Sequence, residues 1–519
     1  MRTGRMAVVV AAVVGAAVVP LSGSGTAWAE DCVPYGADFN GDGCGDIVVA
    51  DPDATVGGVA RAGRVNVLHG GPGGARLLLT QGMAGVGGAP ETDDRFGAVI
   101  HVARIDDDAY ADLVVAVPSE SIGSAGDAGI VHVIFGSASG LGGGKAGLVL
   151  RQGRYGVPGT PEAGDRFGAA IAVNTTDLDG AGYPAPAIAY GVPGEDLGSI
   201  ADAGVAGLVA FDGATGAVAE AADISQDSPG ISGAVEAGDR FGGAVEVFQG
   251  PGGFGCGVVG VDGLTLVVGT PGEDLGSVRD AGMIHLVRGQ TSDSPLTQDS
   301  PGVDGVAEAG DQFGARLALT SFCEHDGPSH VRLAVGVPTE DIGSVRDAGA
   351  VHLFLTDDDQ FPLPQQWSAS QDTPNVAGTA ETGDRFGSSL ALSELFSGNL
   401  GAAPVVVGVP SEDIGSKADA GAVQVFGDQT STPGIGSVSV DQSIVGQPVE
   451  AGDHFGAALA TRLDFLIVGA PDDATYSTGV VHAIAWQTVF GEPGNDLLFV
   501  PGSGSVPGGA ARFGAGVDS

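Results

Sequence analysis

An oxygen-rich turn near the start of the chain is the segment best suited to chemistry. Oxygen donors stand at its first, third, fifth, seventh and ninth positions: Asp38, Asn40, Asp42, the backbone carbonyl of Cys44, and Asp46. Hard cations such as Ca²⁺ take about six to eight oxygen ligands from loops of this kind. The sequence therefore predicts a calcium site. A metal-free turn held by side-chain-to-backbone hydrogen bonds is the alternative.

Two later turns keep part of this pattern. In the second turn Arg104 stands at the first position, where its own charge could replace a cation. The remaining oxygen-bearing positions of that turn are Asp106, Asp108, Tyr110 and Asp112. The third turn retains Asp177 and Asp179 but lacks the last Asp. Both turns are degraded candidates for calcium.

Acidic residues also recur in two kinds of loop. The phrase Pro-x-Glu-Asp-[Leu/Ile]-Gly-Ser-x-x-Asp-Ala-Gly occupies residues 193–204, 271–282, 338–349 and 410–421, with a looser copy at 118–129. A Glu-x-x-Asp pair stands in a second loop, at Glu162 and Asp165, Glu236 and Asp239, Glu308 and Asp311, Glu381 and Asp384, and Glu450 and Asp453.

Motifs for enzymatic chemistry are missing from the sequence. It has no Gly-x-Ser-x-Gly elbow and no His-Glu-x-x-His pair. Four histidines fall at the same point of successive repeats, at His132, His285, His352 and His482. Catalysis needs an asymmetric constellation, so a histidine repeated in this way indicates scaffold.

The elements that position these residues come from a sevenfold repeat. Phe-Gly pairs begin at Phe96, Phe167, Phe241, Phe313, Phe386, Phe455 and Phe513, and apolar runs ending in Pro alternate with them. In the unit after Phe167 we expect strands over 167–173, 187–192 and 205–211, and a fourth ending near Ile224. Four short strands with Gly-rich turns are typical of a propeller blade. The sequence thus predicts an all-β, seven-bladed β-propeller.

The two ends of the chain carry complementary fragments. The first unit lacks a full Phe-Gly strand, whereas the last Phe-Gly pair is followed by only one strand start. We therefore expect residues 512–518 to form the inner strand of the blade whose other strands lie between residue 46 and about residue 80. Closure of this kind removes an open sheet edge.

These motifs resemble the FG-GAP repeats of the integrin α-subunit N-terminal propeller, in a bacterial secreted form. The resemblance rests on the Phe-Gly pairs, the turn at 38–46, strand ends such as 407–410, and the strand at 421–426. It implies calcium in turns on one face and partner binding through loops of the opposite face. The chain departs from integrins, in which the calcium turns lie in later repeats.

The acidic loops have two interpretations within this fold. Both loop types should emerge on one face and place carboxylates around the mouth of the central channel. In the first interpretation their Asp and Ser side chains bond the loop amides, and Arg166, Arg240 or Arg385 pairs with an acid of the next blade. In the second the carboxylates bind cations or a basic ligand. The similarity of the copies favours the first, because a unique site needs one blade to differ.

Charge narrows the range of partners. The chain has 519 residues, with 64 acidic against 21 basic residues and a net charge of −43. Such a surface repels nucleic acids and anionic membranes and suits divalent cations or basic partners. Solubility alone is the other explanation of the charge.

The N-terminus predicts export. Residues 1–29 have a basic start at Arg2 and Arg5, an apolar stretch over 6–20, and a small-residue cleavage site at 27–29. The apolar stretch is too short for a membrane span. We expect a signal peptide over 1–29, a propeller over 30–519, and a secreted protein without a membrane span.

Export permits disulfide bonds among the four cysteines. Cys32 with Cys44 would fix the mature N-terminus beside the first turn. Cys256 and Cys323 fall at similar places in neighbouring repeats. We therefore expect the pairs Cys32–Cys44 and Cys256–Cys323 among the three pairings that are possible.

The function expected from the sequence is that of a calcium-stabilised binding or adhesion module without its own chemistry. We expect a monomer that binds a protein or glycan ligand on the acidic loop face. An extracellular hydrolase at the acidic channel mouth is the alternative, and its residues would stand in the divergent loops at 51–53 or 472–476. A purely structural wall-associated protein is a third possibility.

Overall fold

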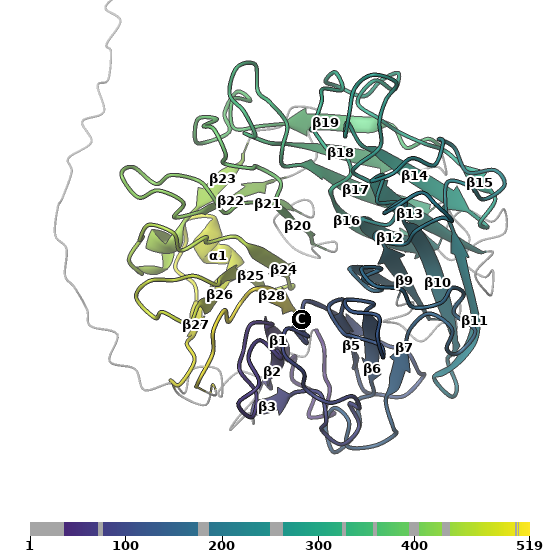
Figure 1. The fold of residues 1–519 in the computed structure, drawn as a ribbon. Coiled ribbons are helices and arrows are strands. Elements are labelled where there is room, and N and C mark those ends of the chain that lie inside the picture. The colour runs from purple at the N-terminus through teal and green to yellow at the C-terminus, as the bar shows by residue number, and fades with distance from the viewer. Residues whose placement is uncertain are drawn as a thin grey trace, which may run out of the picture.

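The chain folds into a ring of seven antiparallel sheets with four strands each (Figure 1). The computed structural model describes residues 36–70, 76–174, 186–249, 263–323, 329–356, 361–393, 404–427, 436–503, 506 and 508–519. Each sheet is a radial blade whose first strand lies nearest the centre. The predicted all-β, seven-bladed propeller is confirmed.

The strands of the first three blades follow one order from the inner strand outward. Blade 1 contains β28 (Gly516–Asp518), β1 (Ile47–Asp51), β2 (Arg64–Leu68) and β3 (Arg76–Leu79). Blade 2 contains β4 (Val99–Ala103), β5 (Asp112–Val117), β6 (Ile130–Ile134) and β7 (Leu148–Leu150). Blade 3 contains β8 (Ala170–Asn174), β9 (Ala187–Val192), β10 (Val205–Asp212) and β11 (Ala217–Ile224). The four strands expected after Phe167 are thus all present.

The other four blades follow the same order. Blade 4 contains β12 (Ala244–Gln249), β13 (Leu264–Thr270), β14 (Met283–Arg288) and β15 (Ser292–Asp293). Blade 5 contains β16 (Arg316–Cys323), β17 (Ser329–Val337), β18 (Ala350–Thr356) and β19 (Gln365–Ala369). Blade 6 contains β20 (Ser389–Leu392), β21 (Val405–Val409), β22 (Ala422–Phe426) and β23 (Val438–Val440). Blade 7 contains β24 (Ala458–Thr461), β25 (Phe465–Ala470), β26 (Val480–Ala485) and β27 (Leu497–Phe499).

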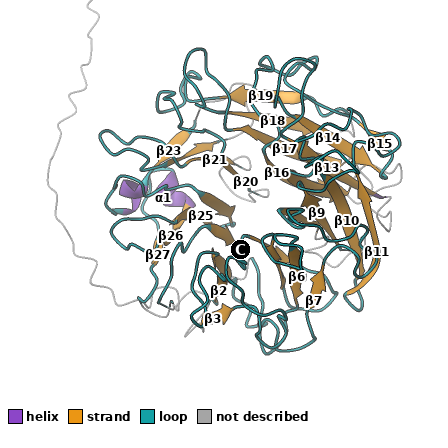
Figure 2. Ribbon diagram, in the orientation of Figure 1, coloured by secondary structure: helices purple, strands orange, loops and turns teal. Residues whose placement is uncertain are grey.

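Helix is confined to two short pieces in the described part of the chain (Figure 2). They are the 3₁₀ turn η3 (Gln442–Val445) and α1 (Trp486–Val489). Short β-rich segments between Gly-rich turns leave little room for helical periodicity.

Each Phe of a Phe-Gly pair lies between two neighbouring blades. Phe96, for example, is fully buried among Val65 and Val67 of blade 1 and Leu113 and Val115 of blade 2. The other six Phe-Gly phenylalanines are at most 1% exposed, and each belongs to a different apolar cluster between blades. Burying a side chain of this size contributes about 1.5–3 kcal/mol. The Phe of each pair is therefore part of the scaffold between blades.

A backbone hydrogen bond joins each Phe to the acidic loop of the preceding blade. The amide of Phe241 donates to the carbonyl of Ala203 at 2.9 Å, and all seven Phe-Gly pairs make the equivalent bond at 2.9–3.0 Å. Beside it, Gly204 has a φ of +85°, and a Cβ there would stand 2.3 Å from the Phe241 carbonyl oxygen. Only glycine tolerates both conditions. The Ala-Gly end of the acidic phrase is thus a contact between blades.

The C-terminal strand closes the ring as predicted. β28 pairs antiparallel with β1, with Val517 opposite Val49, and the C-terminus lies near the centre of the ring (Figure 1). The amide of Gly514 also donates to the carbonyl of Ala50 at 3.0 Å. Asp518 reaches across to blade 2, where its carboxylate accepts the amide of Val102 at 2.7 Å. Segments from the two ends of the chain therefore form one sheet.

Deleting residues 514–519 should open this ring. The deletion removes the buried Val517 and exposes the edge of β1. We expect the free energy of unfolding to fall by roughly 3–5 kcal/mol, from about 2 kcal/mol for the side chain and about 1 kcal/mol for each lost hydrogen bond. Urea unfolding measures the change, and deletion of Ser519 alone is the control. Equal urea midpoints for the deletion and the full chain would show that closure does not stabilise the ring.

Candidate functional site

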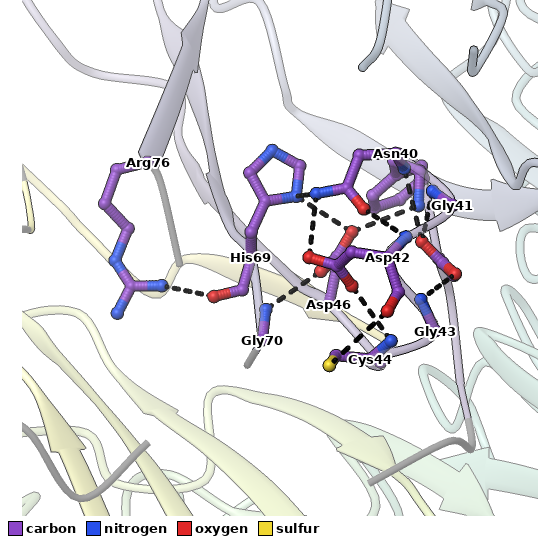
Figure 3. A network of polar contacts seen from close by, with 12 residues as sticks. Asn40, Gly41, Asp42, Gly43, Cys44, Asp46, His69, Gly70 and Arg76 are labelled. Atoms are coloured by element: carbon purple, nitrogen blue, oxygen red, sulfur yellow. Dashed lines mark hydrogen bonds and ion pairs between the residues drawn. The ribbon is translucent and has the colours of Figure 1, made fainter. Parts of the chain in front are cut away.

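The turn at 38–46 is a compact, strongly polar loop before β1 (Figure 3). The carboxylate of Asp38 accepts the amides of Gly41 at 2.7 Å and Gly43 at 2.9 Å. Asn40 accepts the amide of Asp42 at 2.9 Å through its side-chain oxygen. The oxygens of Asp38, Asn40 and Asp42 thus gather in one loop, and they also make the backbone contacts of the metal-free alternative.

Asp46 has a different position from the other predicted ligands. Its side chain is fully buried and accepts the amides of Phe39 at 3.0 Å and Gly70 at 2.9 Å. The Nδ1 atom of His69 lies 2.9 Å from the same carboxylate. Asp46 therefore anchors the turn to its blade. Within the part of the chain that the structure describes, Asp38, Asp42 and Asp46 do not form a group with ligand atoms within 4.8 Å of one another.

The second turn contains a built-in cation. The ammonium of Lys145 donates to Asp106 at 2.5 Å and to the carbonyl of Thr215, in blade 3, at 2.6 Å. It also lies 3.9 Å from the ring centroid of Phe135, a favourable cation–π distance. The positive charge expected from Arg104 is thus supplied at Asp106 by Lys145, which comes from another loop.

Asp112 repeats the anchoring role of Asp46. Its carboxylate accepts the amides of Ile105 at 2.7 Å and Gly136 at 2.9 Å. Burial raises the pKa of Asp112 to about 7 against these two bonds, which lower it. Asp108 accepts the amide of Tyr110 at 2.8 Å. Asp177 and Asp179 of the third turn lie outside the described residues.

The first two turns contact each other. The amide of Ala111 donates to the carbonyl of Asp38 at 2.8 Å. A Cβ at Gly41 would stand 2.5 Å from the ring of Tyr110, so the two loops are closely packed. The second turn thus holds a positive charge at Asp106. The first turn offers side-chain oxygens of the kind that hard cations bind, at Asp38, Asn40 and Asp42.

The repeated Asp of the acidic phrase bonds its own loop. Asp196 accepts the amide of Asp202 at 2.9 Å, and the same bond joins Asp274 to Asp280, Asp341 to Asp347, and Asp413 to Asp419 at 2.8–2.9 Å. The Asp of each Glu-x-x-Asp pair, in the linker that precedes a Phe-Gly pair, does likewise. Asp165, for example, accepts the amide of Glu162 at 2.5 Å. These contacts support the structural interpretation of the loops.

The repeated Glu of the phrase bonds the neighbouring blade. Glu195 of blade 3 accepts the side-chain amide of Gln152, from the end of blade 2, at 2.6 Å. Five junctions have this Gln–Glu pair, through Glu120, Glu195, Glu273, Glu340 and Glu412, at 2.5–2.7 Å. Burial raises the pKa of each of these five Glu side chains to about 7. We did not predict a role for the glutamines from the sequence, although they recur before each linker.

Blade 7 has a divergent acidic loop. It runs from Pro471 to Gly479 and is three residues shorter than the loop of blade 6 from Pro410 to Gly421. Asp473 replaces the usual Glu and accepts the side-chain amide of Gln442 at 2.7 Å. One carboxylate oxygen from each of Asp473, Glu450 and Asp453 lies within 4.8 Å of the other two. The sequence indicated that this loop diverges, but it did not predict this group of three.

The junction between blades 7 and 1 is held by charges. Arg512 donates to Asp472 from two nitrogens at 2.9 and 2.7 Å, and His454 lies 3.0 Å from the same carboxylate. Burial pushes the pKa of Asp472 upward, but the bonds from His454 and Arg512 outweigh it and hold that pKa at about 2. Buried Asp51 accepts the amide of Arg512 at 2.9 Å. Both divergent loops therefore serve ring closure.

The repeated histidines are buried against the Phe-Gly rings. His132 is fully buried, 5.4 Å from the ring of Phe96, and burial lowers its pKa to about 4. His285, His352 and His482 make the equivalent ring contact at 5.1–5.4 Å. In blade 3 Tyr190 fills this space, and its cross-strand partner is Gly207. The scaffold role predicted for these histidines is confirmed.

The cysteine pairing remains a prediction. Cys44 is disulfide-bonded, while Cys32 and Cys256 lie outside the described residues, as does the side chain of Cys323. In the described ranges there is no helix long and apolar enough to cross a membrane.

No protein-family model matches the chain, and no curated protein matches it. Among solved structures it is similar to Sqt1 of Saccharomyces cerevisiae, at 12% identity over 91% of this chain and 86% of that chain, with a TM-score of 0.42. It is also similar to a putative 6-phosphogluconolactonase of Bacteroides fragilis, at 12% identity over 91% and 97%, with a TM-score of 0.38. A third is a eukaryotic initiation factor, at 9% identity over 90% and 87%, with a TM-score of 0.33.

Replacing Lys145 by Met should destabilise the second turn. The change keeps the length of the side chain but removes the ammonium from buried Asp106 and from the ring of Phe135. We expect a loss of about 1–3 kcal/mol of unfolding free energy. Lys417, the other lysine of the chain, is exposed, and Lys417→Met is the matched control in urea unfolding. Equal losses in the two variants would contradict a specific role for Lys145.

The Gln–Glu junctions should make stability depend on pH. Their Glu side chains have a pKa of about 7 when folded against a usual 4.5, so the folded chain binds protons more tightly than the unfolded chain. The resulting stabilisation is complete below pH 4.5 and is lost as the pH rises to about 7. The melting temperature in chelator should therefore be lower at pH 8 than at pH 5.

Glu412→Gln tests the origin of this dependence, because it mimics the protonated side chain at every pH. It should raise the melting temperature at pH 8 and flatten the profile. Glu220→Gln, at an exposed position of β11, should change neither. A melting temperature that is constant from pH 5 to pH 8, or an unchanged profile in Glu412→Gln, would refute the assignment.

Proposed function

We propose that the protein is an extracellular, calcium-stabilised propeller of the FG-GAP type that binds a protein or glycan ligand through its acidic loop face. One observation carries the proposal: the acids of this face divide into two sets. The first set is buried or half-buried and bonds the scaffold, as Asp165 and Glu195 do. The second is exposed and repeats from junction to junction at Glu91, Glu162, Glu236, Glu308 and Glu381.

The exposed set suits a ligand that presents repeated groups. The same carboxylate recurs at five successive junctions, while exposed arginines follow it at Arg95, Arg166, Arg240 and Arg385. Carboxylates and guanidinium groups can both bond hydroxyl or amide groups of a polymer. The net charge of −43 favours a ligand with basic groups or one that binds through divalent cations. Cell-wall glycans and basic extracellular proteins have these properties.

Calcium would stabilise the turn at 38–46, on the face opposite the acidic loops. Asp38, Asn40 and Asp42, with the carbonyl of Cys44, would hold the ion, and Asp46 would fix the turn to β1. The nearby ammonium of Lys145 at the second turn supports a positive charge in this region. Residues 1–29 support secretion of the mature chain, which we propose to be a monomer.

Binding to immobilised cell-wall glycans and to basic proteins tests the proposal. The triple variant Glu162→Gln, Glu236→Gln and Glu308→Gln should lower the affinity at least tenfold and leave the melting temperature unchanged, because these side chains are exposed. Three exposed acids away from this face provide the control: Asp107→Asn, Glu220→Gln and Glu492→Gln. Equal affinities for both triples would refute this face as the binding surface, and turnover of a bound glycan would support a hydrolase.

Calcium is tested separately with Asp42→Asn. A chelator should lower the melting temperature of the natural chain but have a smaller effect on this variant, because one carboxylate of the turn is gone. Unchanged melting of the natural chain in chelator would remove calcium from the proposal and leave ligand binding as a separate question.

A further inference from the structure

Asp472 is shared by two basic side chains that come from different linkers. One carboxylate oxygen accepts Nε of Arg512 at 2.9 Å, and the other accepts Nη2 of Arg512 at 2.7 Å. This second oxygen also lies 3.0 Å from Nδ1 of His454. Arg512 is charged at every ordinary pH, and two cations on one oxygen repel each other. The protonation of His454 therefore decides how strongly the two groups compete for Asp472.

This arrangement belongs to the closure of the ring. The residue after the Pro that ends each apolar run is an Asp in blades 1 and 7 only, as Asp53 and Asp472. Asp53 lies 3.3 Å from Arg95 of the following linker, and the ion pairs of the described residues give it no histidine. In the described part of the chain no ion pair involves Arg166, Arg240 or Arg385. Of the two Asp–Arg pairs at these positions, only the closing one has a second, titratable partner.

His454 is itself a departure from the repeat. The residue before each Phe-Gly pair is Arg in five linkers, Gln312 in one and His454 in the linker before blade 7. Three charged groups face the imidazole: Asp419 from the loop of blade 6, Asp472 from the loop of blade 7, and Arg512 from the closing linker. The amide of His454 also donates to the carbonyl of Asp419 at 3.2 Å.

The direction of the pH effect follows from these three neighbours. The pKa of His454 is raised first by the hydrogen bond to Asp472 and further by Asp419, whereas the charge of Arg512 lowers it. Opening of the closing segment removes Arg512 but leaves both carboxylates, which belong to blades 6 and 7. The pKa of His454 is therefore higher in the open ring than in the closed ring, and protonation favours opening. Global unfolding has the opposite sign, because it removes Asp472 as well.

We propose that His454 is a pH switch on the closure of the ring, which in acid competes with Arg512 for Asp472 and loosens the closing segment. At alkaline pH the neutral imidazole leaves the carboxylate to Arg512, and the closure tightens. The bonds from His454 and Arg512 hold the pKa of Asp472 at about 2 against the effect of burial, so Asp472 itself stays charged throughout this range.

The segment that this switch controls begins at Arg512. The next amide, that of Phe513, donates to the carbonyl of Thr478 at 2.9 Å, and the amide of Gly514 donates to Ala50 at 3.0 Å. Loss of these bonds would separate β28 from β1 and expose the edge of β1. Local opening of this kind is measured by hydrogen exchange.

Hydrogen exchange at Phe513 relative to Phe96 tests the switch in chelator. Both amides follow an Arg and make equivalent bonds, at 2.9 and 3.0 Å, so their intrinsic exchange rates are matched. Phe96 stands beside the Arg95–Asp53 pair, which lacks the histidine. We expect the relative protection of Phe513 to be about two- to fivefold lower at pH 5 than at pH 8, the range for a partly exposed ion pair.

Two variants of His454 separate its charge from its position. His454→Gln should keep the relative protection at the natural pH 8 value across this range, whereas His454→Arg should keep it at the natural pH 5 value. Arg occupies this position in five linkers, so the fold accommodates it. Gln312→His is the matched control, because Thr339 stands where Asp472 stands in blade 7, and it should create no pH dependence at Phe313.

Three results would overturn the proposal. They are equal relative protection of Phe513 at pH 5 and pH 8 in the natural chain, a pH dependence that persists in His454→Gln, and an equal pH dependence at Phe313 in Gln312→His. The last result would show that a histidine at this position acts without the shared carboxylate.

Discussion

The contact between neighbouring blades holds the whole ring together. At every junction a Phe-Gly amide donates to the acidic loop of the preceding blade, while the Phe ring fills the apolar space between two sheets. At Gly204 a Cβ would collide with the Phe241 backbone, so the hydrogen bond exists only with glycine there. A four-stranded blade has two apolar faces, and only neighbouring blades can cover them. Seven repetitions therefore require a closed ring, which the C-terminal strand completes.

The acidic surface of the protein follows partly from this contact. The loops at each junction also carry carboxylates: the buried Asp165 caps a loop amide, and the half-buried Glu195 bonds a glutamine across the junction. Burial raises the pKa of Glu195 and its four counterparts to about 7, since desolvation disfavours their charge. Only the carboxylates that remain exposed are available to a ligand. The distinction between scaffold acids and surface acids is thus set by position in the junction and not by residue type.

Departures from the repeat mark the places where a specific property can arise. Lys145 brings an ammonium to one turn, and the short loop of blade 7 draws Glu450 towards Asp453 and Asp473. In blade 3, Tyr190 with Gly207 replaces the buried histidine of other blades while preserving the packing against Phe167. The first two changes alter the local charge. The third only moves side-chain volume from one strand to its neighbour, because the large Tyr190 lies opposite Gly207. The two kinds of departure therefore have different consequences for binding.

The blade count, the strand order and the closure by residues 512–518 can be predicted from the sequence, because each follows from a period of about seventy residues visible along the chain. Asp38, Asn40 and Asp42 are also recognisable there as one loop, since those residues are neighbours in the chain. The three-dimensional structure was needed to show that Asp46 anchors the turn, that Lys145 supplies a cation, and that Glu450 and Asp473 lie close together. These outcomes depend on loop lengths and on side chains from different blades approaching within a few ångströms. A repeat pattern carries no information about such distances.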